Sequence, residues 1–448
     1  MTAAPAGGSG AGGFSLAGIS VIGIRVLGAG LGFGAQALAS RLIGADQFGY
    51  YALAFVWLIL LGHGATAGTN QLICRFLATY RERGTKNPAA GLLRFAFLMA
   101  AVVAAVVAVA AIGVVQSGVF NVDAEFVVLA SLTFCAIPLL VLQDFLEAIA
   151  RGMDRPTLGI APAMLMRQIA LLAGAGTLLL LGADADALTV MMMTMAGLGA
   201  SILIQVMLLW RPLRAELRGA RPAYESAMWL RTALPVALLD ATETLFNNAD
   251  ILILALFVPP EIVGFYYAAT RLAQFLGYVP YGISAATAQK YAVLHERGDR
   301  KSLQQLISAA TALSTALAVS GAIVLSVIGG YLLLVFGDNF DAAAPILPVL
   351  SLGIVFVCAF GPGEDVLTML GHERVCSAIF FVFISVNVAL NFILVPAFGM
   401  MGAAAATTIA LGLRGGILAW IAHRRTGLYL PVSIARARAA WLDWRAAR

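Results

Sequence analysis

The chain has 448 residues, of which 61% are hydrophobic and only 11% charged, and its formal net charge is +5. Soluble globular domains carry roughly 25% charged residues, so this composition leaves too little polar surface for water and excludes that class. The four cysteines are far apart and lie in or beside apolar runs, and the four histidines are scattered. The sequence therefore shows neither a disulfide framework nor a metal-binding constellation.

Residues 1–13 contain no Lys or Arg and lead directly into an apolar run, unlike the positive start of a signal peptide. We predict a disordered N-terminus over 1–13 and a first helix that is retained. Further apolar runs, each about 20 residues or more and so long enough to cross the bilayer, predict an all-α polytopic membrane protein with about twelve transmembrane helices. They lie near 14–39, 48–70, 92–116, 125–149, 158–182, 188–210, 230–257, 263–289, 305–336, 345–369, 375–397 and 400–422.

Lys and Arg gather in alternate connections between these runs and in the C-terminal tail. The other connections are acidic, and Arg41, at the end of the first run, is the nearest basic residue to them. Basic residues of short loops stay on the cytoplasmic side, so we expect both termini to be cytoplasmic. The one-sided distribution also accounts for the positive net charge without a nucleic-acid partner. The segment 426–448 mixes arginines with Trp, Leu and Ile, which predicts an amphipathic basic tail on the anionic inner leaflet.

A weak internal repeat runs through the chain at an offset of about 215 residues. Gly49-Tyr-Tyr-Ala52 recurs as Gly264-Phe-Tyr-Tyr-Ala268, and two further short motifs recur in the same order. The repeat predicts an N-terminal six-helix lobe (14–220) and a C-terminal six-helix lobe (221–425) around a central cavity. Two such lobes can rock against each other.

The segment 38–53, LASRLIGADQFGYYAL, resembles the opening signature of bacterial polysaccharide-biosynthesis flippases. These belong to the multidrug/oligosaccharidyl-lipid/polysaccharide exporter superfamily. Asn247-Asn-Ala-Asp250, followed by Val263-Gly-Phe-Tyr-Tyr-Ala268, is similar to the second-half signature of the same family. The resemblance spans roughly 14–425, and its motifs indicate the family better than the substrate.

The resemblance implies two bundles in an inverted V. It also implies a polar cavity that accepts the sugar-diphosphate head of an undecaprenyl-linked oligosaccharide while the lipid tail stays in the bilayer. We therefore expect a flippase of the bacterial cytoplasmic membrane that works by alternating access and supplies O-antigen or exopolysaccharide biosynthesis. Its partners would be the lipid-linked oligosaccharide, membrane lipids and polysaccharide polymerase or assembly proteins.

Four arginines lie deep in predicted helices, where a charge is costly and marks a functional hypothesis. They are Arg25, Arg167, Arg271 and Arg414. A guanidinium presents a planar fork of donors that matches phosphate oxygens, so these residues are the candidate diphosphate ligands. The resemblance implies that arginines in the first and eighth helices line a cationic cavity, which favours Arg25 and Arg271. Pairing with acids between helices is the alternative, chiefly for Arg167 and Arg414.

The seventh run carries polar residues at helical spacing that would form one stripe: Asp240, Glu243, Asn247 and Asp250. Two uses compete. They are counter-charges to the arginines, or they bind a coupling ion, H⁺ or Na⁺; no other cofactor is expected.

Candidate gate residues lie in two places. Gly28 and Gly32 in the first helix would allow either bending at a lateral gate or close helix packing. Asp144 and Glu364 occupy equivalent places in the two repeats, where gating and simple interfacial solvation are both open.

Two other functions remain in competition with the flippase. A cation-coupled multidrug exporter shares the architecture, and fold alone cannot choose between them. Arginines in both halves favour an anionic substrate and tilt the choice toward the flippase. A membrane glycosyltransferase, polymerase or ligase would need a sizeable outer loop, whereas the outer connections here are short, so we predict that the protein is not an enzyme.

Overall fold

The computed structural model describes residues 16–119 and 123–433. The predicted disordered segment 1–13 and most of the basic tail, 434–448, lie outside the described residues. In the described part every regular element is helical. The elements are α1 (Leu16–Ala65), α2 (Thr69–Glu82), α3 (Lys86–Gln116), α4 (Ala124–Cys135), α5 (Ile137–Gly152), α6 (Pro156–Leu181), α7 (Ala187–Glu216), α8 (Ser226–Phe246), α9 (Ala249–Leu254), α10 (Pro260–Glu296), α11 (Arg300–Leu333), a 3₁₀ turn η1 (Phe340–Ala343), α12 (Ile346–Phe360), α13 (Gly363–Met369) and α14 (Glu373–Thr426).

Eight segments of the described chain are long and apolar enough to cross a membrane, which confirms the all-α polytopic prediction. Two of them are double. Both α1 and α14 are two helices joined at a sharp bend, at Gly44 (φ 79°) and Gly399 (φ 54°) respectively, where glycine tolerates the left-handed backbone. The predicted runs fall on helices, and the count of twelve crossings stays a prediction.

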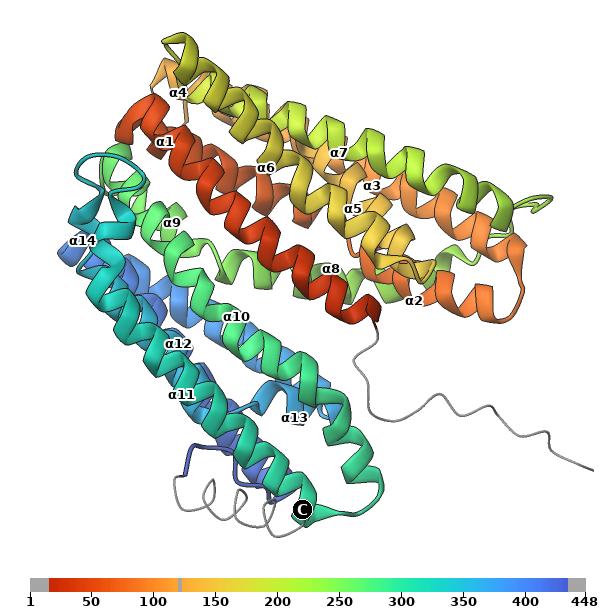
Figure 1. The fold of residues 1–448 in the computed structure, drawn as a ribbon. Coiled ribbons are helices and arrows are strands. Elements are labelled where there is room, and N and C mark those ends of the chain that lie inside the picture. The colour runs from red at the N-terminus through yellow and green to blue at the C-terminus, as the bar shows by residue number, and fades with distance from the viewer. Residues whose placement is uncertain (1–15, 120–122, 434–448) are drawn as a thin grey trace, which may run out of the picture.

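The helices form two bundles arranged as a V (Figure 1). The lobes meet where the acidic turns lie, around 44–46, 183–186 and 337–341, which we call the acidic end. They separate toward the turns around 83–86, 216–225 and 297–301, which we call the basic end. The division at residues 220 and 221 stays a prediction.

Apolar packing explains the V. At the acidic end one cluster of buried residues joins the two lobes, from Phe48 and Tyr51 of α1 to Tyr267 of α10 and Phe336 and Phe340 nearby. At the basic end the described residues form separate clusters, one around Leu77 and Trp229 and another around Ile307 and Leu430. The lobes are therefore held at one end and free to separate at the other.

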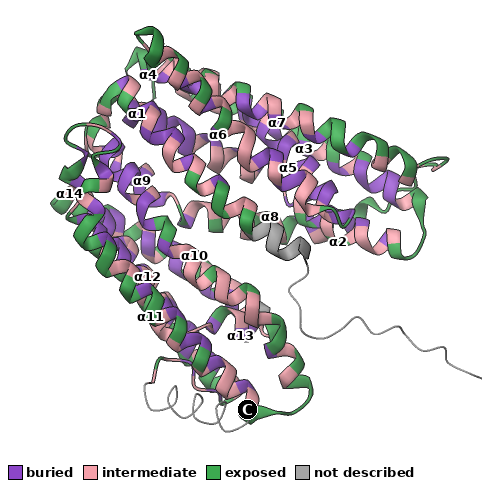
Figure 2. Cartoon of the chain, in the orientation of Figure 1, coloured by how far each residue is buried: buried purple, intermediate pink, exposed green. Residues whose placement is uncertain are grey.

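The surface has the pattern expected of a lipid-facing protein. On α3, Leu98, Val102, Val106 and Val109 are each more than 60% exposed and recur at helical spacing, while four alanines on the opposite face are buried. Such an apolar stripe would be a liability in water. Small residues inside and branched residues outside are typical of membrane helices, and Figure 2 shows exposed residues along the outer faces of both lobes.

The two glycines of the internal repeat meet at the acidic end. A Cβ on Gly49 would overlap the carbonyl oxygen of Pro260, and one on Gly264 would lie 2.8 Å from the carbonyl oxygen of Ala45. The backbones of α1 and α10 therefore touch. Arg41 closes the same end, because its guanidinium donates to the carbonyl oxygens of Leu334 (2.9 Å) and Val335 (2.7 Å) beyond α11.

Helix α8 is attached to both lobes. Trp229 near its start is fully buried among residues of α2 and α3, and its Nε1 donates to the hydroxyl of Tyr80 (3.1 Å). Phe246 at its end is buried in the C-terminal lobe. Pro235 interrupts the hydrogen bonding between these two halves.

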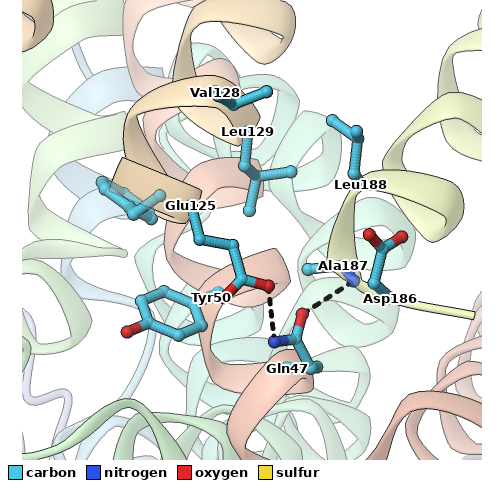
Figure 3. Close-up of a pocket in the computed structure, with 9 residues that line it drawn as sticks. Gln47, Tyr50, Glu125, Val128, Leu129, Asp186, Ala187 and Leu188 are labelled. Atoms are coloured by element: carbon cyan, nitrogen blue, oxygen red, sulfur yellow. Dashed lines mark hydrogen bonds between the residues drawn. The ribbon is translucent and has the colours of Figure 1, made fainter. Parts of the chain in front are cut away.

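Polar groups join three helices at the acidic end, around a small cavity (Figure 3). The amide of Gln47 donates to Glu125 (2.7 Å) and accepts from the backbone of Ala187 (3.0 Å). Asp186 caps α7, and hydrogen bonds from Thr189 hold the pKa of this carboxyl below its usual value. These contacts fix the bend of α1 and the starts of α4 and α7 relative to one another.

Candidate functional site

The seam between α1 and α10 holds Arg271. Tyr267, Arg271 and Phe275 recur every four residues and so share one face of α10. The hydroxyl of Tyr267 accepts from Gln36 of α1 (3.4 Å), and the Phe275 ring lies 5.8 Å from that of Phe33 of α1. Arg271 lies between these two contacts, so it faces the opposite lobe.

Aromatic stacking positions the Arg271 guanidinium. Its carbon lies 4.5 Å from the centre of the Tyr267 ring, and its Nη1 donates to Gln274 (3.1 Å). The Nε is buried with no hydrogen-bond partner among the described residues. Gln274 is therefore the one hydrogen-bond partner of this guanidinium among the described residues, and its other donors are unpaired.

Arg25 lies nearer the open end of the same seam. Its guanidinium carbon is 5.5 Å from the ring centre of Tyr281 on α10, so the contact joins the two lobes. Its Nε is also buried without a described hydrogen-bond partner. Arg25 and Arg271 thus both lie where α1 and α10 face each other, and their role in lining a central cavity stays a prediction.

The other two arginines stack within single lobes. Arg167 on α6 lies 5.2 Å from the ring centre of Phe55, and Arg414 on α14 lies between Phe246 (5.1 Å) and Phe380 (4.5 Å). Ion pairs among the described residues include His63–Asp144, Arg81–Glu216 and Arg151–Glu147, and none of these three involves one of the four arginines. Pairing of these arginines with acids between helices stays the alternative prediction.

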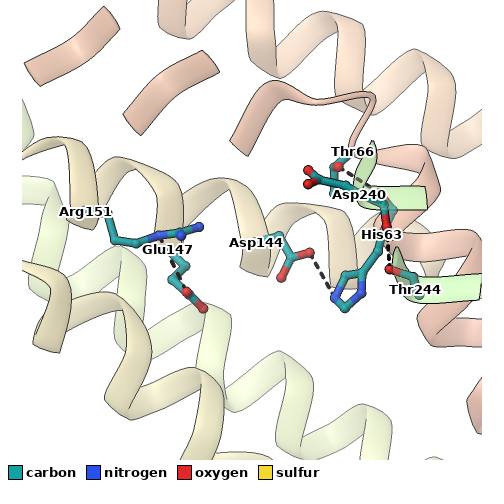
Figure 4. A network of polar contacts seen from close by, with 7 residues as sticks. All are labelled: His63, Thr66, Asp144, Glu147, Arg151, Asp240 and Thr244. Atoms are coloured by element: carbon teal, nitrogen blue, oxygen red, sulfur yellow. Dashed lines mark hydrogen bonds and ion pairs between the residues drawn. The ribbon is translucent and has the colours of Figure 1, made fainter. Parts of the chain in front are cut away.

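A polar cavity of about 180 Å³ opens between the lobes, formed by groups from α1, α2, α5 and α8 (Figure 4). The Nε2 of His63 lies 3.5 Å from Asp144 of α5, and Asp240 and Glu243 line the cavity from α8. Arg151 lies on the opposite wall, where its Nε is 3.7 Å from Glu147. Titratable groups of both lobes therefore share one cavity that is large enough for several water molecules.

The predicted single stripe on the seventh run is wrong, because the helix ends at Phe246 and restarts as α9 at Ala249. Asp240 and Glu243 lie on α8 and Asn247 is exposed at the break. Asp250 is buried on α9, where its carboxylate accepts from Tyr266 (2.7 Å), Thr407 (3.2 Å) and the Ile251 backbone (2.9 Å). The four residues therefore belong to different environments.

A second cavity, of about 420 Å³, lies in the C-terminal lobe. It is lined by Glu243, Tyr281, Glu364, Asp365 and Arg414, together with small and apolar residues of α10–α14. Glu364 and Asp365 enter it from the first turn of α13, directly after the break at Gly361 and Pro362. Tyr281 therefore borders this cavity and also contacts Arg25.

The candidate gate residues fall into two groups. A Cβ on Gly28 would lie 3.1 Å from Cβ of Met164, and one on Gly32 would lie 3.3 Å from Nε2 of Gln168, so both glycines let α6 approach α1 closely. Close packing accounts for them. Asp144 contacts His63 beside the cavity between the lobes, and Glu364 lines the C-terminal cavity. The role of both carboxylates in gating stays a prediction.

Several site residues escape sequence reasoning. His63 is an isolated histidine in the chain, and its partner Asp144 lies on another helix. Tyr281, Phe246 and Phe380 look like ordinary apolar residues of membrane helices until the arginines stack on them. The usable signal is the Gly361-Pro362-Gly363 break, which lies immediately before two carboxylates.

Comparison with known proteins places the chain. A family model described as polysaccharide biosynthesis protein matches residues 15–287, which is more than half of the chain, and one described as MatE matches residues 235–393. The chain belongs to the polysaccharide biosynthesis protein family. Membership confirms the resemblance predicted from the two signatures.

The chain is similar to the probable flippase AglR of Haloferax volcanii, to which it is 29% identical over 177 residues. The match covers 39% of this chain and 37% of the relative, so it spans little more than a third of that protein's length. AglR is described as a probable flippase, and the solved structures that resemble the chain are described as transporters and a flippase, which are not enzymes.

Solved transporters share the fold of this polysaccharide biosynthesis protein. An inward-facing multidrug resistance transporter of the MATE family superposes with a TM-score of 0.74 at 14% identity, over 91% of this chain and 97% of that one. Lipid II flippase MurJ in an inward closed conformation gives 0.63 at 13% identity, over 95% and 90%. These likenesses show the fold of a multi-pass membrane protein.

Proposed function

We propose that this protein is a flippase that moves a polyprenyl-diphosphate-linked oligosaccharide, with undecaprenyl as the expected lipid, from the inner to the outer leaflet of a bacterial cytoplasmic membrane. The supporting observation is the pair Arg25 and Arg271, two guanidinium groups that face across the α1–α10 seam without a carboxylate partner. Unpaired cations are costly at this depth, and a diphosphate supplies the missing acceptors.

The proposed mechanism is alternating access. The conformation described here is closed at the acidic end and open at the basic end. Because short basic loops stay cytoplasmic, the open end would face the cytoplasm, where lipid-linked sugars would enter. Binding of the diphosphate would draw α1 and α10 together at the basic end, and separation of the Gly49–Gly264 contact would release the head group outward. Polymerase or assembly partners stay a prediction.

Asp250 is the carboxylate that best fits a coupling role with H⁺ or Na⁺. It is buried beside two hydroxyl groups, whereas Asp240 and Glu243 border open cavities. Tyr and Thr hydroxyls can donate to a free carboxylate or turn lone pairs toward a cation. Asp250→Asn should therefore abolish the dependence of transport on an imposed H⁺ or Na⁺ gradient, while a response equal to that of the unchanged protein would exclude this assignment.

A cation-coupled multidrug exporter is the second candidate, and the C-terminal cavity favours it. Carboxylates there outnumber the guanidinium three to one, which suits a lipophilic cation. The two functions differ in their need for Arg25 and Arg271, the two arginines of the α1–α10 seam. A diphosphate would bind these guanidinium groups, whereas a cationic drug would gain nothing from them.

The deciding experiment reconstitutes the protein in vesicles containing a labelled polyprenyl-diphosphate sugar and follows its outward movement. Arg25→Ala and Arg271→Ala should each slow movement by about 10- to 100-fold, the value of a lost charge-assisted hydrogen bond. Arg25→Lys should recover only part of the rate, since Lys keeps the charge but not the planar fork. Arg94→Ala, at an exposed arginine of α3, is the matched control. Full rates in both seam variants, with export of a fluorescent lipophilic cation, would favour the exporter.

A further inference from the structure

The C-terminal cavity is built around a fixed break in the chain. Gly361 has φ 84°, and a Cβ there would lie 2.5 Å from the carbonyl oxygen of Leu430 and 2.8 Å from the Thr311 hydroxyl. The segment after α14 packs under this break, where the Val432 amide donates to Ala359 (2.7 Å) and Thr311 donates to Leu430 (3.1 Å). The first turn of α13, with its two carboxylates, therefore follows a break that is held in place by α11, α12 and the segment after α14.

Arg414 is positioned without an ion pair. The rings of Phe246 and Phe380 both contact its guanidinium, and its Nε has no hydrogen-bond partner in the described structure. Glu243 and Glu364 line the same cavity, yet neither lies within 4.0 Å of it as a salt bridge. The guanidinium of Arg414 and the two carboxylates thus share a cavity inside a membrane lobe without forming a salt bridge. A polar ligand could accept hydrogen bonds from the guanidinium and donate hydrogen bonds to the carboxylates.

A sugar ring matches this set of groups. Each hydroxyl can donate to a carboxylate and accept from a guanidinium. The exposed Tyr281 ring at the edge of the cavity offers an apolar face for the C–H side of the ring. The volume of about 420 Å³ lies within the usual range of small-molecule sites.

The cavity also adjoins the proposed diphosphate site. Tyr281 lines it and lies 5.5 Å from the Arg25 guanidinium carbon, so a diphosphate held by Arg25 would bring the attached sugar to the cavity mouth. We propose that this cavity is a carbohydrate subsite that accepts a sugar without negative charge and rejects a uronate, an inference that rests on the proposed flippase function. The surplus of carboxylates repels a further carboxylate, and this repulsion is the basis of rejection.

The test compares two labelled polyprenyl-diphosphate lipids in the same vesicles, one carrying glucose and the other glucuronate at the same position. The unchanged protein should move the glucose lipid at least about tenfold faster, because like charges in contact cost several kcal/mol. In Glu364→Gln/Asp365→Asn this ratio should fall toward one. Asp341→Asn, at an exposed acid of the opposite end, should leave both the rate and the ratio unchanged.

Each result bears on the inference. Equal movement of the two lipids by the unchanged protein would overturn the subsite, and so would a ratio that the double variant does not alter. If the double variant does not fold, as judged by gel filtration, the single variant Glu364→Gln takes its place. The test then compares the glucose-to-glucuronate rate ratio of the unchanged protein with that of Glu364→Gln. Failure of the flippase itself is recognised separately: neither lipid would move, or Arg25→Ala would move both at full rate.

Discussion

Replacing Gly264 with alanine tests whether backbone contact at the acidic end holds the V-shaped conformation. The new Cβ would lie 2.8 Å from the carbonyl oxygen of Ala45 and 3.1 Å from the Gly49 nitrogen. Since non-bonded carbon atoms prefer about 3.5 Å or more, α1 and α10 would have to separate by roughly 0.7 Å. Overpacking of this kind costs about 1–3 kcal/mol, which is roughly a 5- to 150-fold change in the balance between closed and open acidic ends.

The assay measures the distance between spin labels at Asp46 and Glu261, exposed positions on the two sides of this contact. Gly264→Ala should broaden the distribution toward longer distances and lower the unfolding temperature. Gly30→Ala is the control, because a Cβ there has no neighbour within 4 Å and alanine favours the helix. An unchanged distribution together with an unchanged unfolding temperature in Gly264→Ala would refute the reasoning.

Three further substitutions test the contacts around this framework by thermal unfolding in detergent and by spin-label distances. Arg41→Ala removes two charge-assisted hydrogen bonds to the end of α11 and should widen the acidic end, whereas Arg41→Lys should restore only part of the closure. An unchanged label distance in Arg41→Ala would show that these hydrogen bonds do not hold the acidic end closed. Trp229→Phe removes the bond to Tyr80 and should cost about 1 kcal/mol, with α8 loosened from the N-terminal lobe; equal stability would contradict this attachment. Leu430→Ala should cost about 2–5 kcal/mol because the side chain is fully buried, and a smaller loss would show that the segment after α14 contributes little to the lobe.

Much of the fold follows from local patterns. Apolar runs predict the helices because each must satisfy its backbone internally in lipid, and the predicted runs fall on observed helices. Breaks inside the predicted runs are the exceptions, such as the one at Gly361 and the one between α8 and α9. Asp240, Glu243 and Asp250 have helical spacing, yet Asn247 and Asn248 end the helix, so the predicted stripe divides between two cavities and a buried position.

The repeat motif is visible in the sequence, whereas the contact between its two copies is visible only in the structure. Gly49 and Gly264 are recognisable as a pair from their neighbours in the chain, but their mutual contact depends on the docking of two lobes. The same holds for Arg25 and Tyr281, which are more than 250 positions apart in the sequence and meet at the seam.

By itself, the sequence determined that the chain lies in a membrane, that it is helical, that it has basic and acidic sides, and which family signatures it carries. These properties depend on composition and on residues close together along the chain. Only the tertiary structure decided that the four arginines stack on aromatic rings, and that three carboxylates share a cavity with Arg414. The physical reason is that the cost of a charge in a membrane depends on what surrounds it, and those neighbours come from distant helices.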